Sequence, residues 1–195
     1  RRPGGATRGR SSRGSDRLTP AAADAGAPSP SARRGGLANL LLLLAAGIAQ
    51  MLVVVDYTAT AITLPSMARD FDVSADSLQW VITGYVLTFS IVLAIAGPLG
   101  DRYGRRRLLL LGIVLFGAAS LWVGFAGSVT MLIVSRLALG IGGGLLFPLS
   151  TAVVGASTDR SDLPWMMSIL TGIATIGMAI GPVVGGVFTE LIDWR

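Results

Sequence analysis

The sequence predicts an all-α membrane protein, and three observations support that class. Of its 195 residues, 52% are hydrophobic and only 14% are charged, which gives a mean hydropathy of +0.67. The apolar residues gather in five runs, each close to or above the roughly 20 residues that a helix needs to cross a bilayer. The arginines outside those runs gather in segments that would lie on one side of a membrane. We therefore expect five transmembrane helices.

The first 36 residues differ in character from the rest of the chain. They carry eight arginines against Asp16 and Asp24, a net charge of +6, and are rich in Gly, Ser, Pro and Ala. Without hydrophobic periodicity such a segment cannot offset its ordering entropy, so we expect residues 1–36 to form a disordered basic cytoplasmic tail. Its Arg/Gly pattern also suits RNA binding, and Arg33-Arg34 before a leucine-rich run suits an export signal. We favour a tail that orients the first span and expect no nucleic-acid partner, because the remaining residues have a net charge of −1.

The five spans follow in order. The first begins at a leucine-rich run, the second and third flank an arginine cluster, the fourth follows the uncharged pair Gly127-Ser128, and the fifth follows a short charged loop. Their expected bounds are 37–67, 78–99, 108–125, 129–154 and 163–188. The chain ends soon afterwards at Asp193-Trp194-Arg195. We therefore expect the front part of a longer polytopic protein, cut before a sixth span, with the rest of the same polypeptide as a partner.

The loops give an orientation. Arg33-Arg34 and the cluster at 102–107 are two loops apart, so they lie on the same side, which the positive-inside rule makes cytoplasmic. The loop 69–76 between them is net acidic. Four tryptophans fall near span ends, where indole prefers the membrane interface: Trp80, Trp122, Trp165 and Trp194. We expect a multi-pass protein of the plasma membrane with a cytoplasmic N-terminus and lipid around its spans.

Two ionisable residues lie well inside the spans. Asp56 and Arg136 each cost about 2.5–3.5 kcal/mol to insert, so each needs a partner or a water-filled cavity. Counting 1.5 Å per residue from the outer span ends places them at depths of roughly 16 and 10 Å, close enough to meet. One interpretation is a static structural ion pair. The other is that Asp56 takes up and releases a proton beside the guanidinium as a cavity opens to one side and then the other.

Composition narrows the chemistry further. The chain has no Cys and no His, so it lacks disulfides, His-based triads and the usual zinc ligands. No paired intramembrane carboxylates supply a nucleophile or base either, which disfavours an intramembrane enzyme. We expect neither a metal site nor an organic cofactor.

Glycines mark where helices touch. Gly177, Gly181 and Gly185 recur every fourth residue and line one stripe of the fifth span, where another backbone can approach closely. Pro182 removes one helix hydrogen bond beside that stripe and permits a bend. In the fourth span Arg136, Gly140, Gly144 and Pro148 share a stripe in the same way.

The segment GPLGDRYGRRR at 97–107 resembles the loop signature of the major facilitator superfamily, G-x-L-[GAS]-D-R-x-G-R-[RK]. It matches at every fixed position that concerns the site: Gly97, Gly100, Asp101, Arg102, Gly104, Arg105 and Arg106. The fifth span is similar to the antiporter motif G-x-x-x-G-P-x-x-G-G, again complete, at Gly177, Gly181, Pro182, Gly185 and Gly186. The resemblance implies that residues 37–195 form most of an N-terminal six-helix bundle.

Two further segments resemble the fourteen-helix drug/proton antiporter subfamily. The first span is similar to its D-x-T…A-L-P-x-I pattern, with Thr63 and Met67 as departures, and Asp193-Trp194-Arg195 is similar to the start of its sixth span. Around Arg136 the family's R-x-x-Q-G motif has Leu139 in place of Gln. The resemblance still implies a proton-relay role for Asp56 and Arg136, without that polar neighbour.

The implied function is proton-coupled export of small, lipophilic or cationic compounds by alternating access, with the proton as the coupling ion. At the loop, we expect a glycine-permitted tight turn that sets Asp101 among guanidinium groups as a breakable ion-pair latch. A sugar or metabolite symporter remains the nearest alternative, which the fifth-span motif disfavours. A non-transporting membrane receptor is a third possibility, in which the loop would have no gating role.

Overall fold

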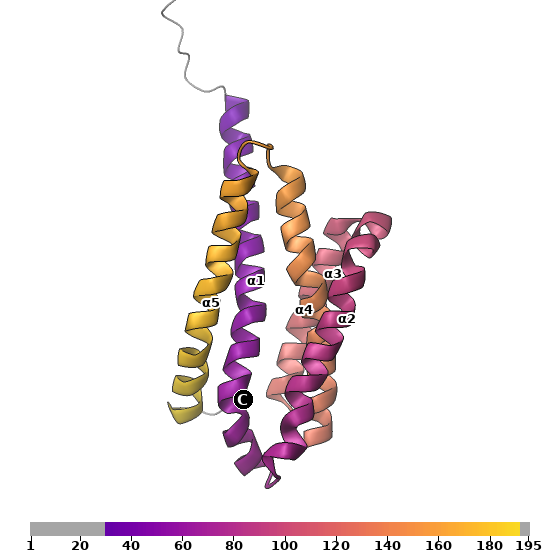
Figure 1. Cartoon of the computed structure of the whole chain (residues 1–195), viewed down its shortest axis with the longest axis vertical. Coiled ribbons are helices and arrows are strands. Elements are labelled where there is room, and N and C mark those ends of the chain that lie inside the picture. Colours follow the sequence, from indigo (N-terminus) through magenta and orange to yellow (C-terminus); the bar gives the residue numbers. More distant parts are fainter. Residues whose placement is uncertain (1–29, 192–195) are drawn as a thin grey trace, which may run out of the picture.

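The computed structural model describes residues 30–191, and these are almost entirely helical (Figure 1). The five helices are α1 (Pro30–Asp70), α2 (Gln79–Tyr103), α3 (Arg105–Gly124), α4 (Val129–Ser157) and α5 (Leu163–Leu191), with a 3-10 turn, η1 (Ala75–Leu78), before α2. All five contain stretches long and apolar enough to cross a membrane, as the sequence predicted. The expectations for residues 1–29 of the tail, and for Asp193-Trp194-Arg195 as the start of a sixth span, lie outside the described residues.

Two boundaries differ from the sequence-based expectation. Helix α1 begins at Pro30, so residues 30–36, expected within the disordered tail, are helical. Proline suits the first turn of a helix, and the Ala and Arg that follow are good helix formers. The expected loop between the second and third spans shrinks to one residue, Gly104, because α2 continues to Tyr103 and α3 starts at Arg105.

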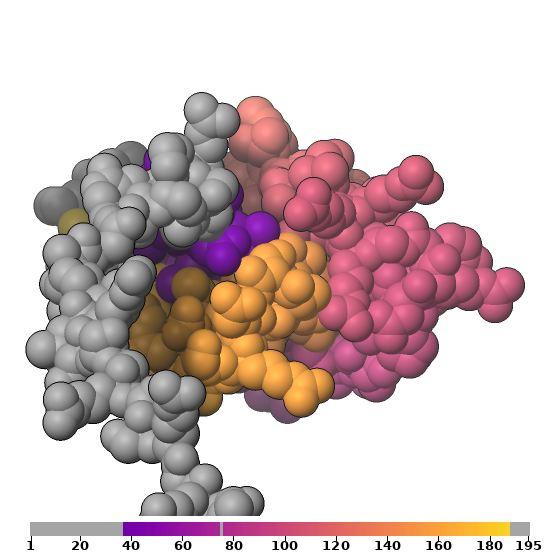
Figure 2. Space-filling model, turned by 90° about the horizontal axis from the view of Figure 1, so that it is seen from above, coloured from indigo at the N-terminus to yellow at the C-terminus, as the bar shows by residue number. Residues whose placement is uncertain are grey.

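The helices form two groups. Helix α5 packs along α1, whereas α4 packs against both α2 and α3 (Figure 1). Seen from the end where α4 finishes, α4 lies between α1 and the α2–α3 junction (Figure 2). In the most apolar stretch of α4, 61% of the residues are buried inside the protein, against 17–28% in the other four spans. Helix α4 is therefore the central helix of the described bundle.

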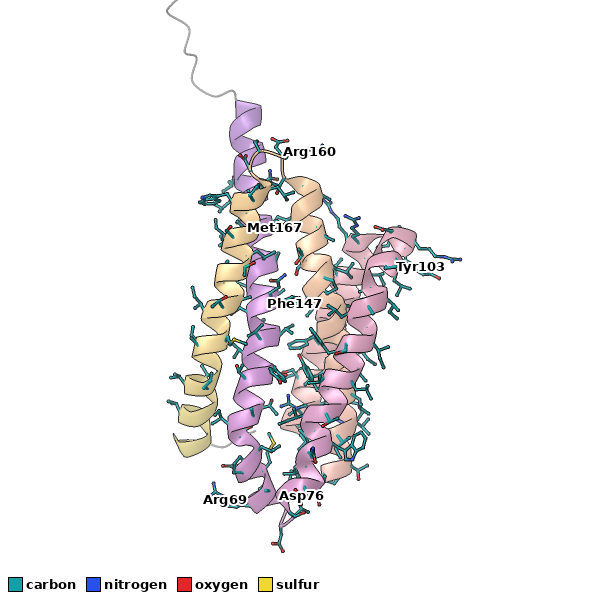
Figure 3. All side chains as sticks on the ribbon, in the orientation of Figure 1. Arg69, Asp76, Tyr103, Phe147, Arg160 and Met167 are labelled. Carbon is teal, nitrogen blue, oxygen red and sulfur yellow. The ribbon has the colours of Figure 1, made fainter. Side chains whose placement is uncertain are left out.

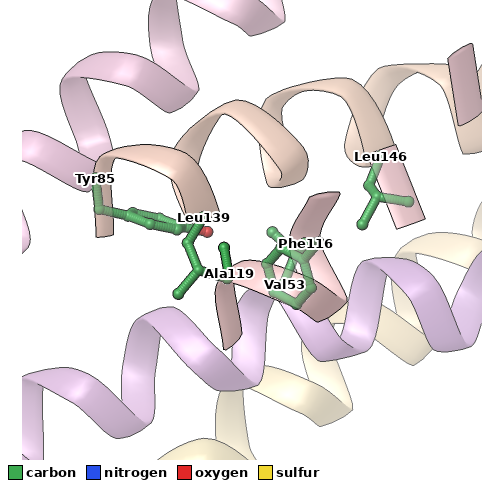
Figure 4. Close-up of a cluster of buried hydrophobic side chains, with 6 residues drawn as sticks. All are labelled: Val53, Tyr85, Phe116, Ala119, Leu139 and Leu146. Atoms are coloured by element: carbon green, nitrogen blue, oxygen red, sulfur yellow. The ribbon is translucent and has the colours of Figure 1, made fainter. Parts of the chain in front are cut away.

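The two groups meet along the α1–α4 seam. We use this name for five residues of α1 facing α4 between Arg136 and Val154: Leu43, Ala46, Gln50, Val53 and Asp56. The seam is closed by apolar clusters. The central cluster joins four helices through Val53, Tyr85, Phe116, Ala119, Leu139 and Leu146 (Figure 4). These clusters hold the polar side chains of the seam at fixed positions.

The ends of the bundle carry different side chains. Tyr103 and Arg160 lie at one end, and Arg69 and Asp76 at the other (Figure 3). The first end also holds the start of α3, which opens with three consecutive arginines, Arg105, Arg106 and Arg107. The bundle is therefore polarised along its long axis.

Candidate functional site

The two intramembrane charges meet across the α1–α4 seam. Arg136 Nη1 of α4 donates to Asp56 Oδ2 of α1 at 3.0 Å. The side chain of Arg136 is only 5% exposed and that of Asp56 is 20% exposed. Depth counting along the spans places them close together, and the structure joins them. Since water is largely excluded from this pair, a change in the charge of either partner changes the energy of the seam.

Two polar atoms near this pair have no hydrogen-bond partner within the described residues. They are Arg136 Nε and the hydroxyl of Tyr85, both buried. A buried donor left unpaired costs roughly 1–3 kcal/mol. The site thus holds more hydrogen-bond donors than the described acceptors satisfy.

A cavity of about 280 Å³ lies close to the pair and is lined by Tyr57, the residue after Asp56 in the chain. Its wall includes four aromatic rings in sequence: Tyr57 stacks on Tyr85 at 6.0 Å between ring centroids, Tyr85 on Phe89 at 5.9 Å, and Phe147 meets Phe89 edge-on at 6.2 Å. No charged residue lines the cavity among those described. Such a wall suits an apolar or aromatic molecule, which it contacts by stacking.

Sequence reasoning missed one polar residue of the seam, Gln50. Its side chain is 97 residues or more from its partners in sequence, and the residue is 3% exposed. Gln50 Nε2 lies 3.1 Å from the carbonyl of Phe147, 3.0 Å from Ser150 Oγ and 2.8 Å from Thr151 Oγ1, all in α4. In the sequence, the feature that could have indicated Gln50 is its position as a single amide side chain inside a long apolar run.

The signature loop forms an ion pair at the arginine-rich end. Arg105 donates from Nε and Nη2 to Asp101 Oδ1 at 3.0 and 2.8 Å, and from Nη1 to the carbonyl of Ala152 at 3.3 Å. The pair thus joins the end of α2, the start of α3 and the last part of α4. Its side chains are 41% and 64% exposed, so its contribution to stability is small, about 0–1 kcal/mol.

The three loop glycines have different roles. Only Gly104 makes the turn, with φ +96°, a conformation that other residues avoid. Gly100 lies inside α2 and is buried where a Cβ would meet Leu149 Cδ2 at 2.6 Å. Gly97 is also helical and faces open space, and nothing in the described structure explains it. The turn is permitted by glycine, as expected, but Gly104 alone makes it, because a single positive-φ residue suffices to reverse the chain between two helices.

The remaining signature arginines, Arg102 and Arg106, are exposed. The guanidinium of Arg102 lies 5.7 Å from the centroid of the Tyr103 ring. Arg106 lines a recess of about 500 Å³ together with Arg105 and Arg107, between the start of α3 and the end of α4. Within residues 30–191, no three acidic side chains cluster closely enough to hold a metal ion.

Three of the four motif glycines in α5 contact α1. A Cβ on Gly177 would meet Met51, one on Gly181 would meet Thr58, and one on Gly185 would lie 2.9 Å from the Cα and carbonyl oxygen of Ala59. The stripe therefore fits α5 directly onto α1, the helix that carries Asp56. A Cβ on Gly186 would meet no described atom within 4 Å, and Pro182 is exposed.

The sequence matches the Major Facilitator Superfamily over residues 46–195. The chain belongs to the major facilitator superfamily. Among superfamily relatives, it is 34% identical over 148 residues to the lincomycin resistance protein of Streptomyces lincolnensis, covering 76% of this chain and 31% of that protein. It is 35% identical over 166 residues to the multidrug efflux pump LfrA of Mycolicibacterium smegmatis, covering 85% and 33%.

A third superfamily relative is the cephamycin export protein CmcT of Amycolatopsis lactamdurans, 37% identical over 154 residues, covering 78% of this chain and 32% of that protein. The chain spans about a third of the length of these curated relatives. The family prediction made from the two motifs is confirmed, and the described helices are part of the superfamily's all-helical fold.

Proposed function

We propose that the chain forms most of the amino-terminal bundle of a secondary active exporter, which expels small, lipophilic or cationic compounds in exchange for protons by alternating access. The observation that carries this proposal is the shielded Asp56–Arg136 pair beside an aromatic cavity. The names of the relatives, which denote antibiotic resistance or export, favour the same direction of transport. The protein is then a transporter, not an enzyme, and the proton is its coupling ion.

The pair supplies a coupling mechanism. While Asp56 is ionised, its charge is balanced by Arg136 across the α1–α4 seam. A proton that adds to the Asp56 carboxylate neutralises its charge, so the guanidinium of Arg136 loses its negatively charged partner. The seam then loosens next to the cavity wall, so proton uptake and a change in the cavity are linked through one contact. Because Arg136 lies in the central helix, a shift there reaches α2 and α3 as well.

The Asp101–Arg105 contact serves as the latch of this cycle. It joins α2, α3 and α4 at their arginine-rich ends, and its exposure lets it break at little cost. We assign that end to the cytoplasm, because arginines concentrate there, and the protein to the plasma membrane with its N-terminus inside. Lipid surrounds the apolar outer faces, and the remaining spans of the same polypeptide complete the pathway.

The test uses the full-length protein in proteoliposomes with an imposed pH gradient and a fluorescent lipophilic cation such as ethidium. Asp56→Asn keeps the size of the side chain but cannot exchange a proton, so gradient-driven transport should be lost. Asp76→Asn, which alters an exposed acid of η1 just before α2, is the matched control and should transport normally. Undiminished gradient-driven transport by Asp56→Asn would refute the coupling role.

The symporter alternative predicts the opposite direction. The complete glycine stripe of α5 seated on α1 favours antiport over it. In the same vesicles, substrate moving with the proton gradient instead of against it would establish symport. A receptor without transport activity would give no gradient-dependent movement in either direction.

A further inference from the structure

Gln50 is the other polar side chain of α1 that crosses the α1–α4 seam. It lies six residues before Asp56, or about 9 Å along the helix axis. Its amide lies within 3.1 Å of three oxygens of one turn of α4: the carbonyl of Phe147, Ser150 Oγ and Thr151 Oγ1. The amide has only two hydrogens, so two of these contacts are satisfied at a time.

The acceptor turn of α4 is complete without Gln50. Ser150 and Thr151 each donate their own hydroxyl to the carbonyl of Phe147, at 2.9 and 3.2 Å. Removing the amide therefore takes away the link between the helices and leaves no hydroxyl donor of α4 unpaired. An effect of substituting Gln50 can therefore be assigned to the lost link between α1 and α4, and not to unpaired hydroxyls in α4.

The same turn carries part of the cavity wall. The ring of Phe147 lines the aromatic cavity and packs edge-on against Phe89, while its carbonyl belongs to the Gln50 cluster. Gln50 thus ties α1 to the backbone of a residue whose side chain faces the cavity. The Asp56–Arg136 pair is the second polar link across the seam, farther toward the outer end.

The two links differ in how they respond to a proton. The ion pair depends on the ionisation of Asp56, whereas an amide bonded to hydroxyls and a carbonyl has no titratable group. We propose that Gln50 is a positioning residue that keeps α1 and the Phe147–Thr151 turn of α4 in register while the Asp56–Arg136 pair opens, so that the seam pivots about the amide. The part of this proposal that concerns the transport cycle rests on the proposed function, but the structural link does not.

The structural link is tested by a distance measurement that needs no transport. Residues 1–195 contain no cysteine. In the full-length protein in nanodiscs, with any cysteine outside these residues replaced by serine, spin labels are attached to cysteines introduced at Leu44 of α1 and Ala156 of α4, both exposed. Pulsed electron paramagnetic resonance then reports the separation of the two helices near the arginine-rich end. The variants are Gln50→Leu, Asp56→Asn and the double variant.

The expected result is non-additive. Gln50→Leu removes one link, and Asp56→Asn weakens the other, because its amide oxygen accepts from Arg136 without a charge. Each single variant should keep most of the short-distance population, whereas the double variant should lose most of it. Interhelical hydrogen bonds in membrane proteins correspond to a roughly 3- to 18-fold change in an equilibrium, so Gln50→Leu in the Asp56→Asn background should shift the closed-to-open ratio by about that factor. Identical distance distributions in all three variants would overturn the proposal.

Two controls keep the test decisive. Thr63→Val removes a buried hydroxyl of α1 that bonds only within its own helix, to Thr60, and should leave the distance unchanged. If Gln50→Leu does not reach the membrane, Ser150→Ala with Thr151→Val removes two of the three acceptors from the α4 side and leaves the carbonyl of Phe147. This variant should show a smaller shift in the same direction in the Asp56→Asn background. Unchanged distances in that variant would also overturn the proposal. If Asp56→Asn loses proton coupling while α1 and α4 stay at the short distance, both the proposed function and the role of Gln50 stand.

Discussion

The contact between α5 and α1 makes a sharp prediction at two adjacent glycines. A methyl group on Gly185 would lie 2.9 Å from both the Cα and the carbonyl oxygen of Ala59, which are backbone atoms and cannot rotate away. An ordinary contact begins near 3.4 Å, so the helices must separate by about 0.5 Å. At Gly186, the next residue, a methyl group would meet no described atom within 4 Å.

The magnitudes follow from those distances. Overpacking costs about 1–3 kcal/mol, and replacing glycine by alanine inside a helix returns up to about 1 kcal/mol. Gly185→Ala should therefore lower the stability of the protein by about 1–2 kcal/mol. Gly186→Ala should leave stability unchanged or raise it by up to about 1 kcal/mol.

The assay is thermal unfolding of the full-length protein in detergent, followed by the loss of the monodisperse peak in size-exclusion chromatography. The two variants differ by one methyl group at neighbouring positions of one motif, so each serves as the control for the other. Equal loss of stability in both would refute the packing argument, since it would mean that the motif acts through something other than the seat of α5 on α1.

Other predictions concern the arginine-rich end. Asp101→Ala should impair transport without reducing membrane insertion, because the Asp101–Arg105 pair is exposed and contributes little to stability. Transport is measured in vesicles, and insertion is measured as the amount of protein in the membrane. Normal transport by this variant would refute the latch role of the pair. Gly104→Ala forces a side chain into φ +96° and should cost about 1–2 kcal/mol in thermal unfolding, whereas Gly97→Ala, in an open helical position, should cost nothing; a harmless Gly104→Ala would contradict the assigned turn.

The sequence predicted the spans well because hydrophobic length and charge placement are local properties. Fold family and span number both follow from them and from two short motifs. The loop was harder to predict: its three glycines read alike in sequence, but Gly100 packs inside a helix and only Gly104 makes the turn. The packing of Gly100 involves Leu149, a residue far away in the chain.

The site was predicted in part. Asp56 and Arg136 stood out because a charge in an apolar span is costly, and their depths matched. Gln50 did not, since an uncharged amide gives no hint of its partner, and finding the partner requires the register of α1 against α4. The aromatic wall was also beyond reach for the same reason: rings such as Phe89 and Phe147 are ordinary in spans until packing brings them together.

The pairing of α1 with α5 bears on biosynthesis. About 120 residues separate the end of α1 at Asp70 from the end of α5 at Leu191. At 5–20 residues per second, a ribosome needs roughly 6–24 s to make them. Throughout that interval the face of α1 later occupied by the glycine stripe has only lipid or the insertion machinery to cover it, while α2, α3 and α4 can already assemble. Among the five described helices, α1 thus waits longest for a helix that packs along it, because α5 is made last.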